Sequence, residues 1–156
     1  MAPDTEIRLA GPADAAQVAR LLAAFRDYYG ESRPGDAAIL EVVRALLDDP
    51  STEFLLAGQP ASGVAQLRFR LSVWTGNEDA WLEDVFVLEG ARGEGLGRAL
   101  VAASVERAHE RGCRRIQLDA NEDNAVALVL YESLGFKNAK REAGDGGRDL
   151  YWTKWL

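Results

Sequence analysis

The chain has 156 residues, 47% of them hydrophobic, which is enough to bury the core of one ordinary domain without covalent staples. Its 25 acidic and 18 basic residues give a formal net charge of -7, which argues against a protein that coats nucleic acid. One cysteine and one histidine exclude an intramolecular disulfide and a zinc site built on several of either residue, so we expect no metal.

The sequence predicts neither a membrane span nor a secretory signal. No apolar run approaches the ~20 residues of a membrane span, and MAPDTEIRLA at the N-terminus lacks the pattern of a secretory signal. The Gly/Pro-rich stretches at 32–36 and 58–63 are short enough to be loops within a domain. We therefore expect a soluble cytoplasmic protein, a single domain over residues 1–156, with no nucleic-acid or membrane partner.

Helical and strand-like patterns alternate through the first half of the chain. A helix is predicted to open at residues 11–14, because the apolar residues Val18, Leu21, Leu22 and Phe25 follow at helical spacing. A second helical pattern covers Ala37–Leu47. Short apolar or alternating runs predict strands at 6–9, 54–57, 63–71 and 81–87, with a hairpin turn at 75–78.

The second half begins with a helical pattern from about Gly95 to Arg111. A strand follows at 115–118, and then a helix that ends before Gly135, with N-cap candidates at 121–124. A turn at 144–147 and a strand at 150–156 complete the chain. Helices that interrupt strands, around three consecutive strands in the middle, predict an α/β protein with one mixed sheet and helices on both faces.

The segment WLEDVFVLEGARGEGLGRALV, residues 81–101, places a glycine-rich loop between a strand and a helix. Helix N-termini expose unpaired N–H groups with partial positive charge, glycine allows a ligand to approach the backbone, and Arg92 and Arg98 add charge. These features predict a pyrophosphate cradle. The segment does not match the Walker motif, because no Lys follows these glycines. It does not match the dinucleotide-binding motif G-x-G-x-x-G either, because Arg98 occupies the position of the third glycine. The alternative is a plain strand–turn–helix corner.

A second motif lies in LDANEDNAVALVLYESLGF, residues 118–136. The two segments together resemble the GNAT superfamily of acetyl-CoA-dependent N-acetyltransferases. The first is similar to the family's Arg/Gln-x-x-Gly-x-Gly/Ala loop over 92–97, and the second to its Asn-x-x-Ala-x-x-Leu-Tyr-x-x-x-Gly-Phe run over 124–136. The resemblance covers most of the chain and is weakest over 28–62. It implies a GNAT-like fold, with a mostly antiparallel twisted sheet flanked by helices on both faces.

The resemblance also implies which residues hold acetyl-CoA. The backbone of Val85, Phe86 and Val87 would pair with the pantetheine arm like an added strand. Asn124 would bond this arm from the second motif, which also includes Ala127, and Tyr131 would lie beside the sulfur; its alternative role is a half-buried core aromatic. Backbone N–H groups along the loop would hold the pyrophosphate, namely those of Arg92, Gly93, Glu94, Gly95, Leu96, Gly97 and Arg98.

Acetyl transfer to an amine needs a proton acceptor and a proton donor. An alkyl ammonium has a pKa of about 10.4, so forming the neutral nucleophile at pH 7 costs roughly 4–5 kcal/mol, which a general base must offset. The departing thiolate resembles cysteine, with a pKa of about 8.5, and a tyrosine can protonate it. Tyr131 is therefore the candidate acid, in a direct transfer without an acyl-enzyme.

Glu83 and Asp84 are the candidates for the base. Adjacent strand residues point to opposite faces, so only one of the two is expected to face the site. The run Leu82-Glu83-Asp84 resembles the branch of the family that acetylates polyamines and related small amines, which favours Glu83 as the base. The alternative for either carboxylate is an ion pair with an arginine or a turn cap.

The expected acceptor is a small amine that is cationic in solution. Tyr28 and Tyr29 are predicted in the loop after the first helix. The resemblance implies that this region helps to line the acceptor site, where with Glu83 and Asp84 the two tyrosines could bind a cation; ordinary loop packing is the alternative. Other open alternatives are an amino acid, an antibiotic or a protein N-terminus as acceptor, and a non-catalytic acyl-CoA-binding or regulatory module. Large aromatic residues alternate along 150–156, which could place one face of this strand at a subunit contact. Because proteins of the family commonly form dimers, the resemblance favours a homodimer.

Overall fold

A computed structural model describes residues 6–138 and 149–156. Its strands form a single seven-stranded sheet of order β1-β2-β3-β4-β5-β7-β6, in which only β4 and β5 are parallel neighbours. The predicted mixed, mostly antiparallel sheet is therefore confirmed. The strands are β1 (Ile7–Leu9), β2 (Thr52–Ala57), β3 (Gly63–Ser72), β4 (Asn77–Val87), β5 (Arg115–Asn121), β6 (Lys137–Asn138) and β7 (Asp149–Trp155).

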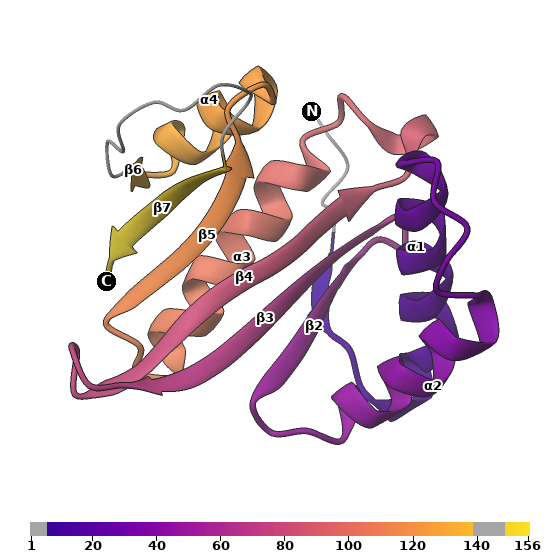
Figure 1. Cartoon of the computed structure of the whole chain (residues 1–156), viewed down its shortest axis with the longest axis horizontal. Helices are drawn as coiled ribbons and strands as arrows, with labels where there is room; N and C mark the ends of the chain where they lie inside the picture. The colour runs from indigo at the N-terminus through magenta and orange to yellow at the C-terminus, as the bar shows by residue number, and fades with distance from the viewer. Residues whose placement is uncertain (1–5, 139–148) are drawn as a thin grey trace.

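Helices cover both faces of this sheet, as predicted. Figure 1 shows α1 and α2 together on one face and α3 on the other. The helices are α1 (Ala15–Tyr28), α2 (Asp36–Leu47), α3 (Leu96–Glu110) and α4 (Ala125–Ser133), with short 3-10 turns at Pro12–Asp14 and Glu89–Ala91. Among the described residues, no helix combines the length and apolar character that a membrane crossing requires.

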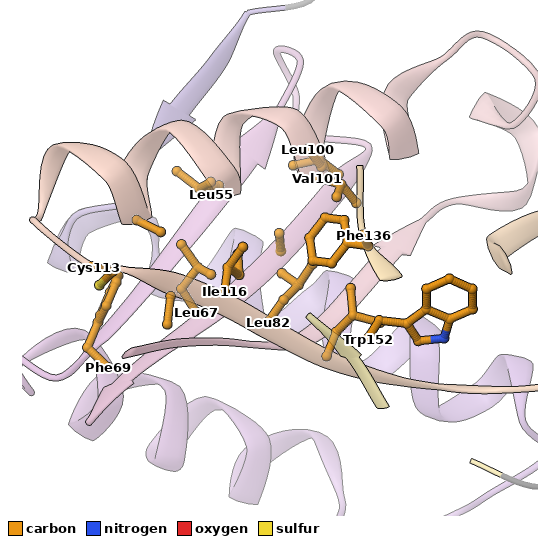
Figure 2. Packing of buried hydrophobic residues seen from close by; sticks show 14 of the residues in the cluster. Leu55, Leu67, Phe69, Leu82, Leu100, Val101, Cys113, Ile116, Phe136 and Trp152 are labelled. Carbon is orange, nitrogen blue, oxygen red and sulfur yellow. The ribbon is translucent and has the colours of Figure 1, made fainter. Parts of the chain in front are cut away.

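The core divides into two clusters because strand side chains alternate between the faces. In β2, Leu55 and Ala57 pack toward α3, while Phe54 and Leu56 pack toward α1 and α2. Figure 2 shows the α3 cluster, with Leu100 and Val101 directed toward the strands below them. The buried sheet thus holds α1 and α3 in fixed positions on opposite sides of β4.

The parallel contact between β4 and β5 is short. Their residues pair only as Ala80 with Ile116 and Trp81 with Gln117. Beyond these pairs the strands separate, and Figure 1 shows the gap widening toward their carboxyl ends. The edge of β4 that faces β5 is therefore left without a strand partner from Leu82 onward, although the strand continues to Val87.

The structure corrects several predicted boundaries. Tyr28 and Tyr29 are predicted in the loop after the first helix. In the structure Tyr28 is the last residue of α1 and Tyr29 is its C-cap. β5 continues through Asn121, because its polar end still pairs with β7, and Asn124 alone caps α4. The two-residue strand β6 escaped prediction because it is too short to show a pattern. The predicted turn at 144–147 lies outside the described residues.

Candidate active site

A cavity of about 620 Å³ occupies the gap between β4 and β5, and we call it the transfer cavity. The two separating strands supply its sides, the end of α1 one rim, and α4 the other. It brings together eight of the predicted site residues from three distant segments of the chain. They are Tyr28, Tyr29, Glu83, Asp84, Val85, Asn124, Ala127 and Tyr131.

A β-bulge changes the orientation of the two candidate bases. Gln66 of β3 pairs with Asp84, but the next residue, Leu67, pairs with Leu82, so Glu83 is an extra residue without a partner. The bulge shifts the alternation of β4 by one position. The prediction that Glu83 and Asp84 face opposite sides is therefore wrong, since both line the transfer cavity.

The two carboxylates have different environments. Glu83 forms an ion pair with Arg68, and both side chains are more than one-third exposed. The pKa of Asp84 is raised from 3.8 to about 6, chiefly by burial and also by the neighbouring negative charge of Glu83. Asp84 is thus the carboxylate that exchanges a proton closest to neutral pH.

A second cavity, of about 670 Å³, lies between α1, α2 and the sheet, and we call it the acceptor cavity. It shares Phe25, Tyr29, Glu83 and Asp84 with the transfer cavity. The carboxylate pair therefore stands where the two cavities meet, and a group bound in one lies beside a group bound in the other.

Tyr131 lines the transfer cavity from α4, on the side opposite α1. Its ring packs at 5.9 Å from that of Phe136 and 6.3 Å from that of Trp152, measured between centroids. Burial raises the pKa of Tyr131, and the negative charge of Asp119 acts in the same direction. The phenol therefore stays protonated at neutral pH, as a proton donor must.

The predicted pyrophosphate loop joins the end of β4 to α3. Gly93 and Gly95 have φ values of +83° and +82°, a left-handed conformation that favours glycine. The first hydrogen bond of α3 runs from the Ala99 N–H to the carbonyl oxygen of Gly95. The N–H groups of Leu96, Gly97 and Arg98 therefore precede this bond at the helix N-terminus, an arrangement that suits an anion.

The two arginines of the loop make contacts that the sequence did not reveal. Arg92 donates from Nε to the carbonyl oxygen of Val87 at 3.1 Å, and its guanidinium lies 4.4 Å from the centroid of the Tyr28 ring. Arg98 donates to the hydroxyl of Ser133 on α4. Each arginine thus connects the loop to a helix that lines the transfer cavity.

The other predicted contacts with acetyl-CoA come from the backbone of β4 and from the side chain of Asn124, which caps α4. Val85 and Val87 pack on the α3 side of the sheet and Phe86 on the α1 side, so only their backbone faces the gap. The Asn124 side-chain oxygen accepts from the N–H of Ala127 at 3.2 Å, which leaves the amide nitrogen as a donor. These positions fit an extended polar chain in the gap.

Three lining features were missed by sequence reasoning: Gln66, Arg68 and the apolar face of α2. In β4 the side chains that pack toward α3 change from even positions, at Ala80 and Leu82, to odd positions, at Val85 and Val87, which is the phase change that a bulge produces. The sequence alone does not reveal this change, because Trp81 and Phe86 are apolar as well. Within residues 6–138 and 149–156, no three His, Cys, Asp or Glu side chains gather to hold a metal ion.

Comparison with known proteins places these features in a family. Residues 18–136 match the acetyltransferase (GNAT) family model. The mycothiol acetyltransferase of Gordonia bronchialis is 35% identical over 140 residues, 85% of this chain and 44% of that protein. The aminoglycoside N(6')-acetyltransferase type 1 of Stenotrophomonas maltophilia is 30% identical over 140 residues, 86% of this chain and 88% of that protein.

A solved structure from Arthrobacter sp. FB24, assigned as an acetyltransferase, has a TM-score of 0.81 and 34% identity. The match covers 93% of this chain and 94% of that one. The chain spans less than half of the mycothiol acetyltransferase, so only the shared domain is compared there. The chain belongs to the GNAT family of acetyltransferases, which confirms the predicted family, the fold class and acetyl-CoA as the cofactor.

Proposed function

We propose that this protein acts in the cytoplasm and transfers an acetyl group from acetyl-CoA directly to the primary amine of a small acceptor that is cationic in solution. One observation carries the proposal. The transfer cavity and the acceptor cavity meet at Glu83 and Asp84, while Tyr131 lines the transfer cavity. A proton acceptor thus lies between the two binding spaces, and a proton donor lies within one of them.

Acetyl-CoA supplies the acetyl thioester, and the chain has fitting groups for each of its parts. The unpaired edge of β4 over Val85–Val87 suits the amides of the pantetheine arm, and Asn124 and Ala127 flank the same gap. The loop over Arg92–Arg98 suits the pyrophosphate, because it combines free N–H groups with two arginines.

The transfer balances when the nitrogen gives up two protons. The bound ammonium gives the first to the carboxylate pair, the neutral nitrogen forms a bond to the acetyl carbon, and the carbon–sulfur bond breaks as Tyr131 protonates the sulfur. The second proton of the nitrogen then restores the Tyr131 phenol, which leaves a neutral amide and a free thiol. The pKa of Asp84, about 6, suits a base near neutral pH, and Glu83 forms an ion pair with Arg68. The assignment of Glu83 as the general base therefore stays a prediction. The variants Asp84→Asn and Glu83→Gln distinguish this assignment from one to Asp84.

The acceptor wall is formed by aromatic side chains at the end of α1. Phe25 stacks on Phe86 with 4.9 Å between centroids, and Tyr29 meets Phe25 edge-on at 5.2 Å. Tyr29 lines both cavities together with the carboxylates, whereas Tyr28 lines the transfer cavity and has the Arg92 guanidinium 4.4 Å from its ring centroid. This wall supports the expected binding of an ammonium group.

Replacement of Tyr131 by Phe tests the transfer itself. Release of free thiol from acetyl-CoA, measured with a panel of amines, should fall roughly 100-fold in kcat because the sulfur leaves without a proton. The Kd for acetyl-CoA should stay within about twofold of wild type, since the ring and its packing remain. A wild-type protein that binds acetyl-CoA but releases no thiol with any amine would favour a non-catalytic binding module.

Asp84→Asn should raise stability while it lowers activity. A carboxyl whose pKa rises from 3.8 to about 6 on folding binds protons more tightly when folded, so stability falls as pH rises through this window. At pH 7.5 the variant should be about 1–3 kcal/mol more stable in urea denaturation, and at pH 4 the difference should vanish.

Glu83→Gln is the matched variant, because it removes the adjacent carboxylate from an exposed ion pair that contributes little stability. The acid limb of kcat/KM, centred near pH 6, should disappear in Asp84→Asn and persist in Glu83→Gln. Loss of the limb in Glu83→Gln alone would assign the base to Glu83.

Gly97→Ala tests the pyrophosphate loop without disturbing the fold. A Cβ at Gly97 would meet no atom within 4 Å, and alanine favours the helix, so the variant should be as stable as wild type. The Kd for CoA should rise roughly tenfold, because the methyl group blocks close approach of a phosphate to the helix N-terminus. Gly11→Ala, which also opens onto free space, should leave binding unchanged.

We also propose a homodimer that uses the outer face of the C-terminal strand. Trp152 of β7 is buried, whereas Trp155 is 65% exposed. An aromatic ring of that size gains from coverage by a second copy. Sedimentation at micromolar concentration should give the mass of two chains for wild type and of one for Trp155→Lys; a wild-type monomer would contradict the proposal.

A further inference from the structure

The acceptor cavity has an apolar wall that a polar, polycationic acceptor would not use. The wall comes mainly from α2, where Ile39 and Val43 are buried while Val42 is 56% exposed at the cavity. Leu46 of α2 and Leu22 of α1 extend the same surface. A ligand with a hydrocarbon side chain would remove this surface from water and bind through it.

Most charged side chains of the acceptor cavity are already paired. Arg26 forms ion pairs with Asp27 and Asp36, which lie outside the cavity lining, and Arg68 is paired with Glu83. The other lining charges are Arg33, Glu31 and Asp84, an excess of one negative charge. This excess suits one ammonium group better than the several amines of a polyamine or an aminoglycoside.

Gln66 adds a buried amide nitrogen that lacks a hydrogen-bond partner in the part of the chain that the structure describes. Its side chain lines the acceptor cavity and is only 4% exposed, and its Nε2 finds no hydrogen-bond partner among the described residues. A buried amide normally makes such a bond. Gln66 lies directly across the β3–β4 ladder from Asp84, so the two side chains are neighbours on one face of the sheet.

We propose that the acceptor is an apolar α-amino carbonyl compound, whose ammonium lies at Glu83 and Asp84, whose carbonyl oxygen accepts from the Gln66 amide, and whose side chain packs on α2. This inference rests on the proposed acetyl transfer. The pairing of Gln66 with Asp84 places an amide beside a carboxylate on one face of the sheet, which suits a ligand with an amine and a carbonyl on adjacent carbons. An α-amine also has a pKa of about 8, so it needs a weaker base than an alkylamine does.

The first experiment compares ligands by calorimetry in the presence of CoA, and by thiol release with acetyl-CoA. L-leucinamide should bind at least tenfold more tightly than spermidine or kanamycin. A tripeptide that begins with leucine distinguishes a free amino-acid derivative from a peptide N-terminus as the source of the same chemistry. Tighter binding of spermidine or kanamycin would overturn the inference and leave acetyl transfer intact, whereas leucinamide binding without turnover would overturn acetyl transfer alone.

The second experiment isolates the bond to Gln66. L-leucinamide and 3-methylbutylamine share the amine and the hydrocarbon, but only the first has a carbonyl group. Gln66→Leu should weaken binding of leucinamide roughly tenfold and leave that of 3-methylbutylamine within about twofold. Its Tm should match or exceed that of wild type, because a buried unpaired amide is removed. Equal weakening of both ligands would overturn the assigned role of Gln66.

The third experiment tests the apolar wall with a matched pair of exposed valines. Val42→Glu places a charge at the acceptor cavity, whereas Val73→Glu makes the same change on the β3–β4 hairpin, where the side chain is 89% exposed. The first variant should raise the KM of leucinamide at least fivefold and lower that of spermidine, and the second should change neither. An unchanged KM for leucinamide in Val42→Glu would contradict the proposed contact with α2.

Discussion

The early separation of β4 from β5 is the constraint on which the rest of the site depends. Two residue pairs hold the parallel strands together, and the sheet then opens although both strands continue. Backbone N–H and C=O groups without a partner are costly unless water or a ligand satisfies them. The gap therefore provides a polar backbone edge for an extended ligand and the space of the transfer cavity. The two packed clusters on opposite faces hold this opening in place, because each anchors one of the flanking helices.

The bulge at Glu83 places reactivity at this opening. A regular strand would have turned one of the two carboxylates toward α3, into an apolar cluster. With the bulge, both acids lie at the junction of the cavities, and their mutual repulsion adds to burial in raising the pKa of Asp84. A carboxyl kept in this state costs stability at neutral pH, which is the common compromise between a stable fold and a reactive group. Arg68 limits the cost by pairing with Glu83.

The sequence was most informative where local chemistry decides the structure. The left-handed glycines at 93 and 95 and the cap at Asn124 are short-range features, so the loop and α4 could be predicted together with the strands around them. The acceptor cavity could not be predicted, since it depends on the register that sets Gln66 against Asp84 and on how α2 packs over the sheet. The rule of alternating strand residues failed at Glu83 for the same reason, because a bulge is a property of two paired strands.

Arg92 links the two halves of the site. Its backbone belongs to the loop that suits the pyrophosphate, while its guanidinium lies over Tyr28 and, at 5.6 Å from the ring centroid, over Phe86. Phe86 in turn stacks on Phe25, which lines both cavities. A guanidinium between two aromatic rings is held by cation–π attraction and by its bond to the Val87 carbonyl, so the loop cannot shift without moving the aromatic wall. The cofactor loop and the acceptor wall are therefore one connected unit, built around the end of the strand whose edge the gap exposes.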